Sequence, residues 1–184
     1  MAGPRVLSMK GSVQAARVLP KAVFVLILGL SPMVGAGDLP QRKVKPEQAL
    51  AIVVNRSNQV DNLSTDELRK IFLGSRSHWP NGRRITIAML DYEQAERKAA
   101  LRQIYKMDED AYRNHFLKEE YRGNVFAVPK TLTSPEVMRK FIFNAPGAIG
   151  YLRASDVDES VKVLRIDGRL PDDKDYTLQI DEPL

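Results

Sequence analysis

The stretch Asn144-Ala145-Pro146-Gly147-Ala148-Ile149-Gly150-Tyr151-Leu152 joins the end of a helix to the start of a strand. Pro146 ends the helix because it has no N–H to donate and its ring clashes with the preceding turn. Pro-Gly predicts a tight turn in which Gly147 takes a positive φ. The apolar residues that follow predict a short buried strand, and Gly150 within it indicates that another backbone or a ligand passes closely above. Without wider context, an ordinary helix-to-strand connection explains the same residues.

Residues 1–36 have the order of a secretory signal peptide, with basic residues first, then an apolar run, then small residues. The run Ala22 to Leu30 is shorter than the ~20 residues that span a bilayer, so we expect no membrane span after cleavage at Ala36. An uncleaved anchor is the alternative, and Met9 is an alternative start. The expected location is periplasmic or secreted.

Without this segment the chain is almost neutral, because Lys plus Arg falls from 28 to 24 against 23 Asp plus Glu. A charge of about +1 lacks the electrostatic footprint of a nucleic-acid binder. The absence of cysteine excludes thiol catalysis, zinc ribbons and iron–sulfur sites. The remaining residues, about 148, are enough for one domain with its own core.

The strongest local signal is the start of a short helix at Leu63-Ser64-Thr65-Asp66-Glu67-Leu68. Ser64 and Glu67 have the spacing of a capping box, in which each side chain accepts an N–H at the other position. Gly74 then fits the residue just past the helix end. Ahead of this helix, the continuous apolar run from Ala49 to Asn55 predicts a strand buried on both faces.

The rest of the chain alternates helices and strands. Trp79 is expected to cover the core rather than to form a binding platform. We predict a strand over 85–90, a helix from Asp91 to about Lys106 and an extended link over 125–130. The tail after Arg169 is expected to be loosely held. A further helix begins at Asp108, and its inward residues are expected to be Ala111, Tyr112 and Phe116. Another begins at Ser134, and its buried residues are expected to be Val137, Met138, Phe141 and Ile142. A last strand is predicted over 161–166.

Two motifs together resemble the phosphate-binding proteins that serve ABC importers. One is the helix signature with Ser64, Glu67, Ile71-Phe72, Gly74 and Trp79; the other is Pro146-Gly147-Ala148-Ile149-Gly150-Tyr151. The resemblance covers roughly residues 49–166 and implies an α/β fold, a single lobe of a type II periplasmic-binding-protein-like fold with a mixed sheet flanked by helices. The expected boundaries are a signal peptide over 1–36, a lead-in over 37–48, this domain over 49–168 and a polar tail over 169–184.

The chain departs from the resemblance in two ways. It matches mainly one lobe of a two-lobed family, so one wall of the ligand cleft is missing. The family also follows the strand at 85–90 with an Arg and a Ser-Gly-Thr turn that holds phosphate through backbone N–H groups. This chain has Leu90-Asp91-Tyr92-Glu93-Gln94-Ala95-Glu96 there, and carboxylates at a helix start repel a second anion. We therefore expect no phosphate binding at this turn.

Two groups of residues are candidates for a small-anion site elsewhere. Arg76, Arg83 and Arg84 form the most basic local patch, for which surface solvation is the simpler interpretation. Lys130, Thr131 and Ser134 lie where a helix begins, and an ordinary N-cap explains Ser134 as well.

The leading hypothesis is an exported, non-enzymatic module like the substrate-binding proteins, without a cofactor or a metal. The alternative is an interaction module that docks on an envelope protein or dimerises through exposed hinge strands, whose edges need covering. A hydrolase ranks lower, because His78 and His115 lack a glycine-framed serine. Asp156, Asp158 and Glu159 lack the spacing of a calcium loop.

Overall fold

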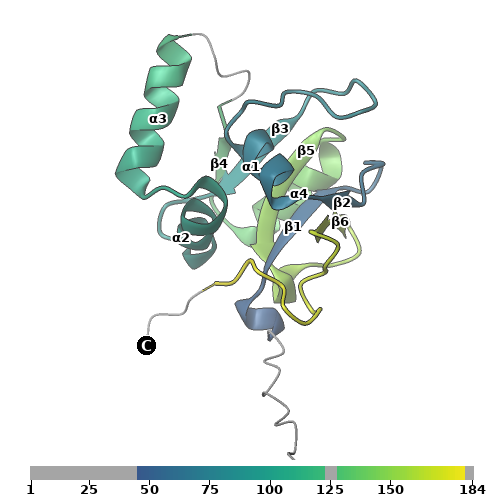
Figure 1. The fold of residues 1–184 in the computed structure, drawn as a ribbon. Helices are drawn as coiled ribbons and strands as arrows, with labels where there is room; N and C mark the ends of the chain where they lie inside the picture. Colours follow the sequence, from purple (N-terminus) through teal and green to yellow (C-terminus); the bar gives the residue numbers. More distant parts are fainter. Residues whose placement is uncertain (1–44, 123–127, 181–184) are drawn as a thin grey trace, which may run out of the picture. The chain divides into compact units, whose positions relative to one another are not determined.

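The computed structural model describes residues 45–122 and 128–180, all of which belong to one compact unit, Asp38–Leu184. The predicted signal peptide lies outside the described residues. A five-stranded mixed sheet forms the centre, with the order β4-β3-β5-β1-β6 (Figure 1). Its strands are β1 (Leu50–Asn55), β3 (Thr86–Leu90), β4 (Lys130–Leu132), β5 (Ala148–Arg153) and β6 (Val161–Val163). The predicted mixed α/β fold is confirmed.

Strand directions divide the sheet into two parts. β3 pairs in parallel with β4 and β5, whereas β1 pairs antiparallel with β5 and β6. β1 is buried along its whole length, as its unbroken apolar sequence predicts for a central strand. The predicted last strand is two strands, β6 and β7 (Arg165–Ile166), and β7 pairs in parallel with β2 (Asn62–Leu63) in a small second sheet. The sequence did not predict β2 or β4.

Helices cover both faces of the sheet. They are α1 (Thr65–Phe72), α2 (Ala95–Ala100), its π-helical continuation η2 (Leu101–Tyr105), α3 (Glu109–Tyr121) and α4 (Pro135–Asn144), with short 3-10 turns η1 (Pro46–Gln48) and η3 (Ala154–Asp156). Successive strand residues point to opposite faces. Gly150 faces α4, where an added Cβ would lie 2.7 Å from the Met138 sulfur, so the group that approaches it most closely is a side chain and not the predicted backbone or ligand. Tyr151 faces the other side and packs against Phe72 of α1.

The turn before β5 differs from the prediction. Gly147 does not have a positive φ; the glycines that do are Gly74, Gly82 and Gly168. Gly147 is required for a different reason, because a Cβ there would lie 2.1 Å from the carbonyl oxygen of Arg84. Trp79 covers this turn, is buried, and donates its indole N–H to the Gly147 carbonyl at 3.0 Å. The expectation that Trp79 covers the core is confirmed.

The segment after Arg169 is not loosely held, as far as Ile180. Tyr176, Leu178 and Ile180 are buried, and the Tyr176 hydroxyl donates to the Leu50 carbonyl at 2.8 Å. Leu50 N–H donates to the Leu178 carbonyl and Ile180 N–H to the Gln48 carbonyl, so the tail forms an extra strand-like edge at the start of β1. The alternation of apolar residues over 176–180 is the physical reason, since it presents one face to the core.

Two predicted helix faces also need correction. Ala111 of α3 and Val137 of α4 are exposed, whereas Phe116, Met138 and Ile142 are buried as predicted. Both residues lie in the first turn of their helix.

The capping box at the start of α1 is confirmed. Ser64 Oγ accepts the Glu67 N–H at 3.2 Å, and Glu67 Oε2 accepts the Ser64 N–H at 3.0 Å. The backbone hydrogen bond from Ser64 lowers the pKa of Glu67. Gly74 follows the helix with a φ of 75°, as the predicted C-terminal stop requires.

We expect Ser64→Ala to lower the free energy of unfolding by about 1 kcal/mol, the usual cost of losing an N-cap. The pKa of Glu67 should rise toward its ordinary value. A depressed pKa gives stability that is present above the unfolded value of 4.5 and is lost as the pH falls through the folded pKa. Urea unfolding at pH 7 and pH 3 measures this, and the difference between the two proteins should shrink at the lower pH. An equal difference at both pH values would contradict the role of Glu67.

Candidate ligand-binding site

The carboxyl ends of β3 and β4 meet at one edge of the sheet, the usual ligand position in open α/β folds. The Asp91 N–H donates to the Leu132 carbonyl at 2.9 Å, which joins the two strand ends. The segment between β3 and α2 therefore lies at this edge, and Ser134, the N-cap of α4, follows the end of β4.

The segment Asp91–Gln94 is a turn, so the prediction that the helix begins at Asp91 was wrong. The Gln94 N–H donates to the Asp91 carbonyl at 3.1 Å, and α2 begins at Ala95 without a side-chain cap. Asp91 Oδ1 accepts the N–H of Tyr92 at 2.7 Å. A carboxylate of the chain itself thus occupies one of the N–H groups that a turn offers to an anion.

Two partly buried ion pairs involve Glu96 and Arg97, at the start of the helix that follows this turn. Arg97 is 6% exposed and donates Nε and Nη2 to the two carboxylate oxygens of Glu109, at 3.0 and 2.7 Å, and Nη1 to the Leu90 carbonyl at 3.0 Å. Burial lowers the pKa of Arg97, but the hydrogen bonds and charge of Glu109 more than offset this and leave it raised. Glu96, 5% exposed, accepts from Arg153 Nε at 2.8 Å. The sequence had indicated that the Glu96 carboxylate lies free at the helix start. In the structure it is paired with Arg153 instead.

Three tyrosines fill the space beneath the end of β3. The Leu90 N–H donates to the Tyr151 hydroxyl at 3.2 Å, and the hydroxyls of Tyr105 and Tyr112 each lie 3.1 Å from the Met89 sulfur. Burial raises the pKa of Tyr112 to about 12 and raises the pKa values of Tyr105 and Tyr151 as well. These phenols remain protonated at neutral pH, and their rings pack against Phe72 and Phe116.

The predicted arginine patch does not converge on one point. Arg76 forms a 3.5 Å ion pair with Glu67 of α1, whereas Arg83 Nη1 donates to Ser57 Oγ at 3.4 Å. The backbone of Arg84 bridges to His78, and its carbonyl lies under Gly147. These residues surround the Trp79 loop, ahead of β3.

The second predicted group lies at the other end of β3. Lys130 pairs with Ala88 across the sheet, and its ammonium lies 5.4 Å from the ring centroid of Phe141. Thr131 is exposed on β4. Ser134 Oγ accepts the Val137 N–H at 3.3 Å, which is an N-cap. The structure does not bring this group and the arginines together.

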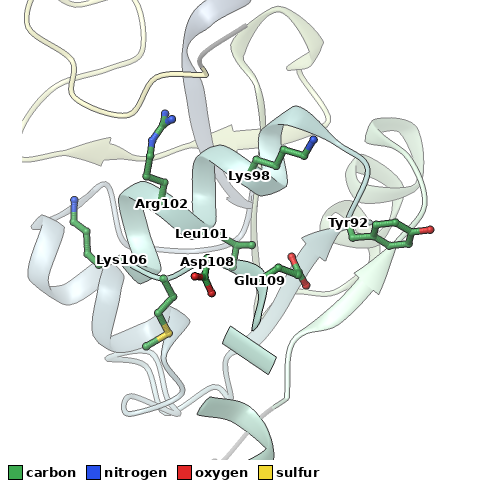
Figure 2. A pocket seen from close by; sticks show the side chains of 8 residues that line it. Tyr92, Lys98, Leu101, Arg102, Lys106, Asp108 and Glu109 are labelled. Atoms are coloured by element: carbon green, nitrogen blue, oxygen red, sulfur yellow. The ribbon is translucent and has the colours of Figure 1, made fainter. Parts of the chain in front are cut away.

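Sequence reasoning missed a pocket beside the acidic turn. It has a volume of about 800 Å³ and a largely apolar wall. Figure 2 shows its side chains, which come from the turn, from α2 and η2, and from the start of α3. The lining residues are Tyr92, Lys98, Leu101, Arg102, Lys106, Met107, Asp108 and Glu109. The spacing of four between Lys98, Arg102 and Lys106 was the available signal, since such residues share one side of a helix.

Two further searches of the described residues, 45–122 and 128–180, found nothing. No helix there is long and apolar enough to cross a membrane. No cluster of three or more His, Cys, Asp or Glu side chains in that part of the chain is placed to hold a metal ion.

Comparison with known proteins gives one curated relative. The phosphate-binding protein PstS of Bacillus subtilis (strain 168) is 32% identical over 126 residues, which are 68% of this chain and 38% of that protein. No protein-family model matches the sequence.

Two solved structures share the fold. An ABC-type phosphate transport receptor from Vibrio cholerae has a TM-score of 0.52 at 21% identity, over 67% of this chain and 48% of the receptor. A putative phosphate ABC transporter substrate-binding protein with bound phosphate, from Clostridium perfringens, has a TM-score of 0.52 at 19% identity, over 67% and 47%. The chain spans less than half the length of these relatives. It is thus a relative of the phosphate-binding proteins, with the α/β fold of a single lobe of a periplasmic binding protein.

Proposed function

We propose that this chain is an exported, non-enzymatic binding module in which an acidic turn has replaced the phosphate-holding turn of its relatives. The observation that carries this is the bidentate contact of Arg97 with Glu109 behind the turn. Arg97 is the buried cation nearest to the end of β3, and a carboxylate of α3 already neutralises it. A second, partly buried cation nearby, Arg153, forms an ion pair with the buried Glu96 through its Nε.

The charge balance at the turn argues against a phosphate dianion. An incoming phosphate would meet the carboxylates of Asp91 and Glu93 and would find no buried cation free of a carboxylate among the residues just described. Displacing Glu109 from Arg97 would also leave a partly buried carboxylate without its partner, which is costly.

The strand edges give little support to the alternative of dimerisation. The edge strands β4 and β6 contain three residues each. Each carries a lysine, Lys130 or Lys162, and short edges with lysine are the usual protection against edge-to-edge pairing. The central strand β1 has neighbours on both sides.

Export is part of the proposal and rests on the sequence of residues 1–36. Its support is the order of basic, apolar and small residues, together with the relatives' role as binding proteins of phosphate importers.

Calorimetric titration with phosphate tests the proposal. We expect no saturable heat at low salt, with sulfate as the second anion and a cooperative thermal transition as proof of folding. Saturable binding of phosphate at micromolar concentration, absent with sulfate, would contradict the proposal and would restore a transport role.

A further inference from the structure

The pocket beside the acidic turn combines an apolar wall with cations at its rim. Leu101 is buried at its wall and Met107 is half-buried. Lys98, Arg102 and Lys106 add their aliphatic stems to the wall while their charged ends remain at the surface (Figure 2). A volume of about 800 Å³ lies in the usual range for small-molecule sites, which are mostly apolar with a few fixed polar groups.

The helix that carries these cations is irregular at the pocket. Residues Leu101–Tyr105 form a π-helical turn, a rare element that occurs frequently at functional sites. The turn ends at Lys106, whose φ of 59° lies in the left-handed region. A side chain with a Cβ adopts this conformation at a cost in free energy, and glycine does so without it. Lys106 thus stands at a rim position where glycine would adopt the same backbone conformation at a lower cost in free energy.

The charges that line the pocket do not balance. The Glu109 carboxylate is paired with Arg97, whereas Asp108 keeps its negative charge while its Oδ1 accepts the Ala111 N–H at 2.7 Å. The side chains of Lys98 and Lys106 make no ion pair or hydrogen bond with any residue in 45–122 or 128–180. These two ammonium groups therefore stand against the single carboxylate of Asp108, and their net charge is positive next to apolar surface.

We propose that this pocket binds an organic anion with an apolar body, such as a medium-chain carboxylate. The apolar body lies against Leu101 and Met107, with the Tyr92 ring at the side, and the carboxylate meets the ammonium group of Lys106. Charge-assisted hydrogen bonds of this kind fix the anionic end, and burial of the chain supplies the remaining affinity. The inference rests on the proposed function, since it names the ligand class of the same non-enzymatic module.

The experiment is a calorimetric titration of the purified protein with octanoate at low salt. We expect saturable binding with one site and weaker binding at high salt. Two matched probes separate the contributions, 1-octanol for the apolar body without charge and phosphate for charge without an apolar body. Both should bind far more weakly than octanoate. Octanol binding as tight as octanoate, or no octanoate binding at all, overturns the inference.

Lys106→Gly is the decisive variant because it removes the cation and relieves the left-handed strain at the same time. Its thermal stability should be equal or higher, while its affinity for octanoate falls about tenfold, the loss expected for one charge-assisted contact. Lys98→Gln should weaken binding less, because Lys98 lies eight residues from Lys106 and adds only to the positive charge of the rim, and Lys70→Gln on α1 should leave it unchanged. Unchanged affinity in Lys106→Gly overturns the inference.

The titration with phosphate, repeated on Lys106→Gly, distinguishes failure of the inference from failure of the proposed function. Saturable phosphate binding that persists in Lys106→Gly lies outside this pocket and contradicts the proposed function. Phosphate binding that disappears in Lys106→Gly places a simple anion in the pocket and overturns the inference.

Discussion

Gly147→Ala is expected to lower the free energy of unfolding by about 3 kcal/mol, the upper range for overpacking a tight site. The new Cβ would lie 2.1 Å from the Arg84 carbonyl oxygen, which is backbone and cannot rotate away. The Gly147 carbonyl also accepts from the Trp79 indole at 3.0 Å and from the Thr86 N–H at 3.1 Å, so neither segment can shift without losing a contact. Urea unfolding measures the change.

Gly82→Ala is the matched control for this prediction. Gly82 has a φ of 78° and no heavy atom within 4 Å of an added Cβ, so alanine there costs only the left-handed conformation, about 1 kcal/mol. If the two variants unfold at the same urea concentration, the close approach at Gly147 is not what requires glycine.

Arg153→Met is expected to cost about 3 kcal/mol at neutral pH, because removing one partner of a buried pair leaves an uncompensated charge. The Glu96 side chain is 6% exposed and accepts from Arg153 Nε at 2.8 Å. Arg153 also donates to the Glu47 carbonyl, so part of the cost belongs to that contact. Thermal and urea unfolding measure the loss.

The double variant Glu96→Gln with Arg153→Met tests the cause. Neutralising the buried carboxylate should recover most of the lost stability. Arg122→Met removes the exposed pair with Glu119, whose arginine side chain is 65% exposed, and should change the stability by less than about 0.5 kcal/mol. A double variant no more stable than Arg153→Met would show that packing, not charge, is lost.

Features with close partners in the sequence were predictable. The Ser64–Glu67 box needs only residues three apart, and the strand from Leu50 needs only its own apolar pattern. Features whose partners are distant in sequence were not. Nothing near Gly147 in the sequence points to the Arg84 carbonyl, and nothing near Glu96 points to Arg153, 57 residues away. Glu96 was therefore interpreted as a free charge at a helix start.

The candidate site was less predictable than the fold. The arginines around Trp79 are close in sequence, but Arg76 and Arg83 have different partners, so clustering along the chain did not become clustering in space. The lysines of the pocket are four residues apart, yet the π-helical turn and the loop with Tyr92 that complete the pocket depend on tertiary packing. The apolar residues at 176, 178 and 180 alternate with polar ones in the sequence, and they are buried in the structure. The acidic residues around them led to the prediction of a loosely held tail.

The position of β1 has a consequence for the order in which the chain folds. This strand is synthesised early, but its partners β5 and β6 come about a hundred residues later. Tyr176, whose hydroxyl donates to the carbonyl of Leu50, is 126 residues away from Leu50. Contacts so distant form slowly because the intervening loop must first be closed. The nascent chain therefore cannot complete its sheet before β5 and β6 are made. During that time the apolar run of β1, buried in the finished fold, is the segment most exposed to aggregation.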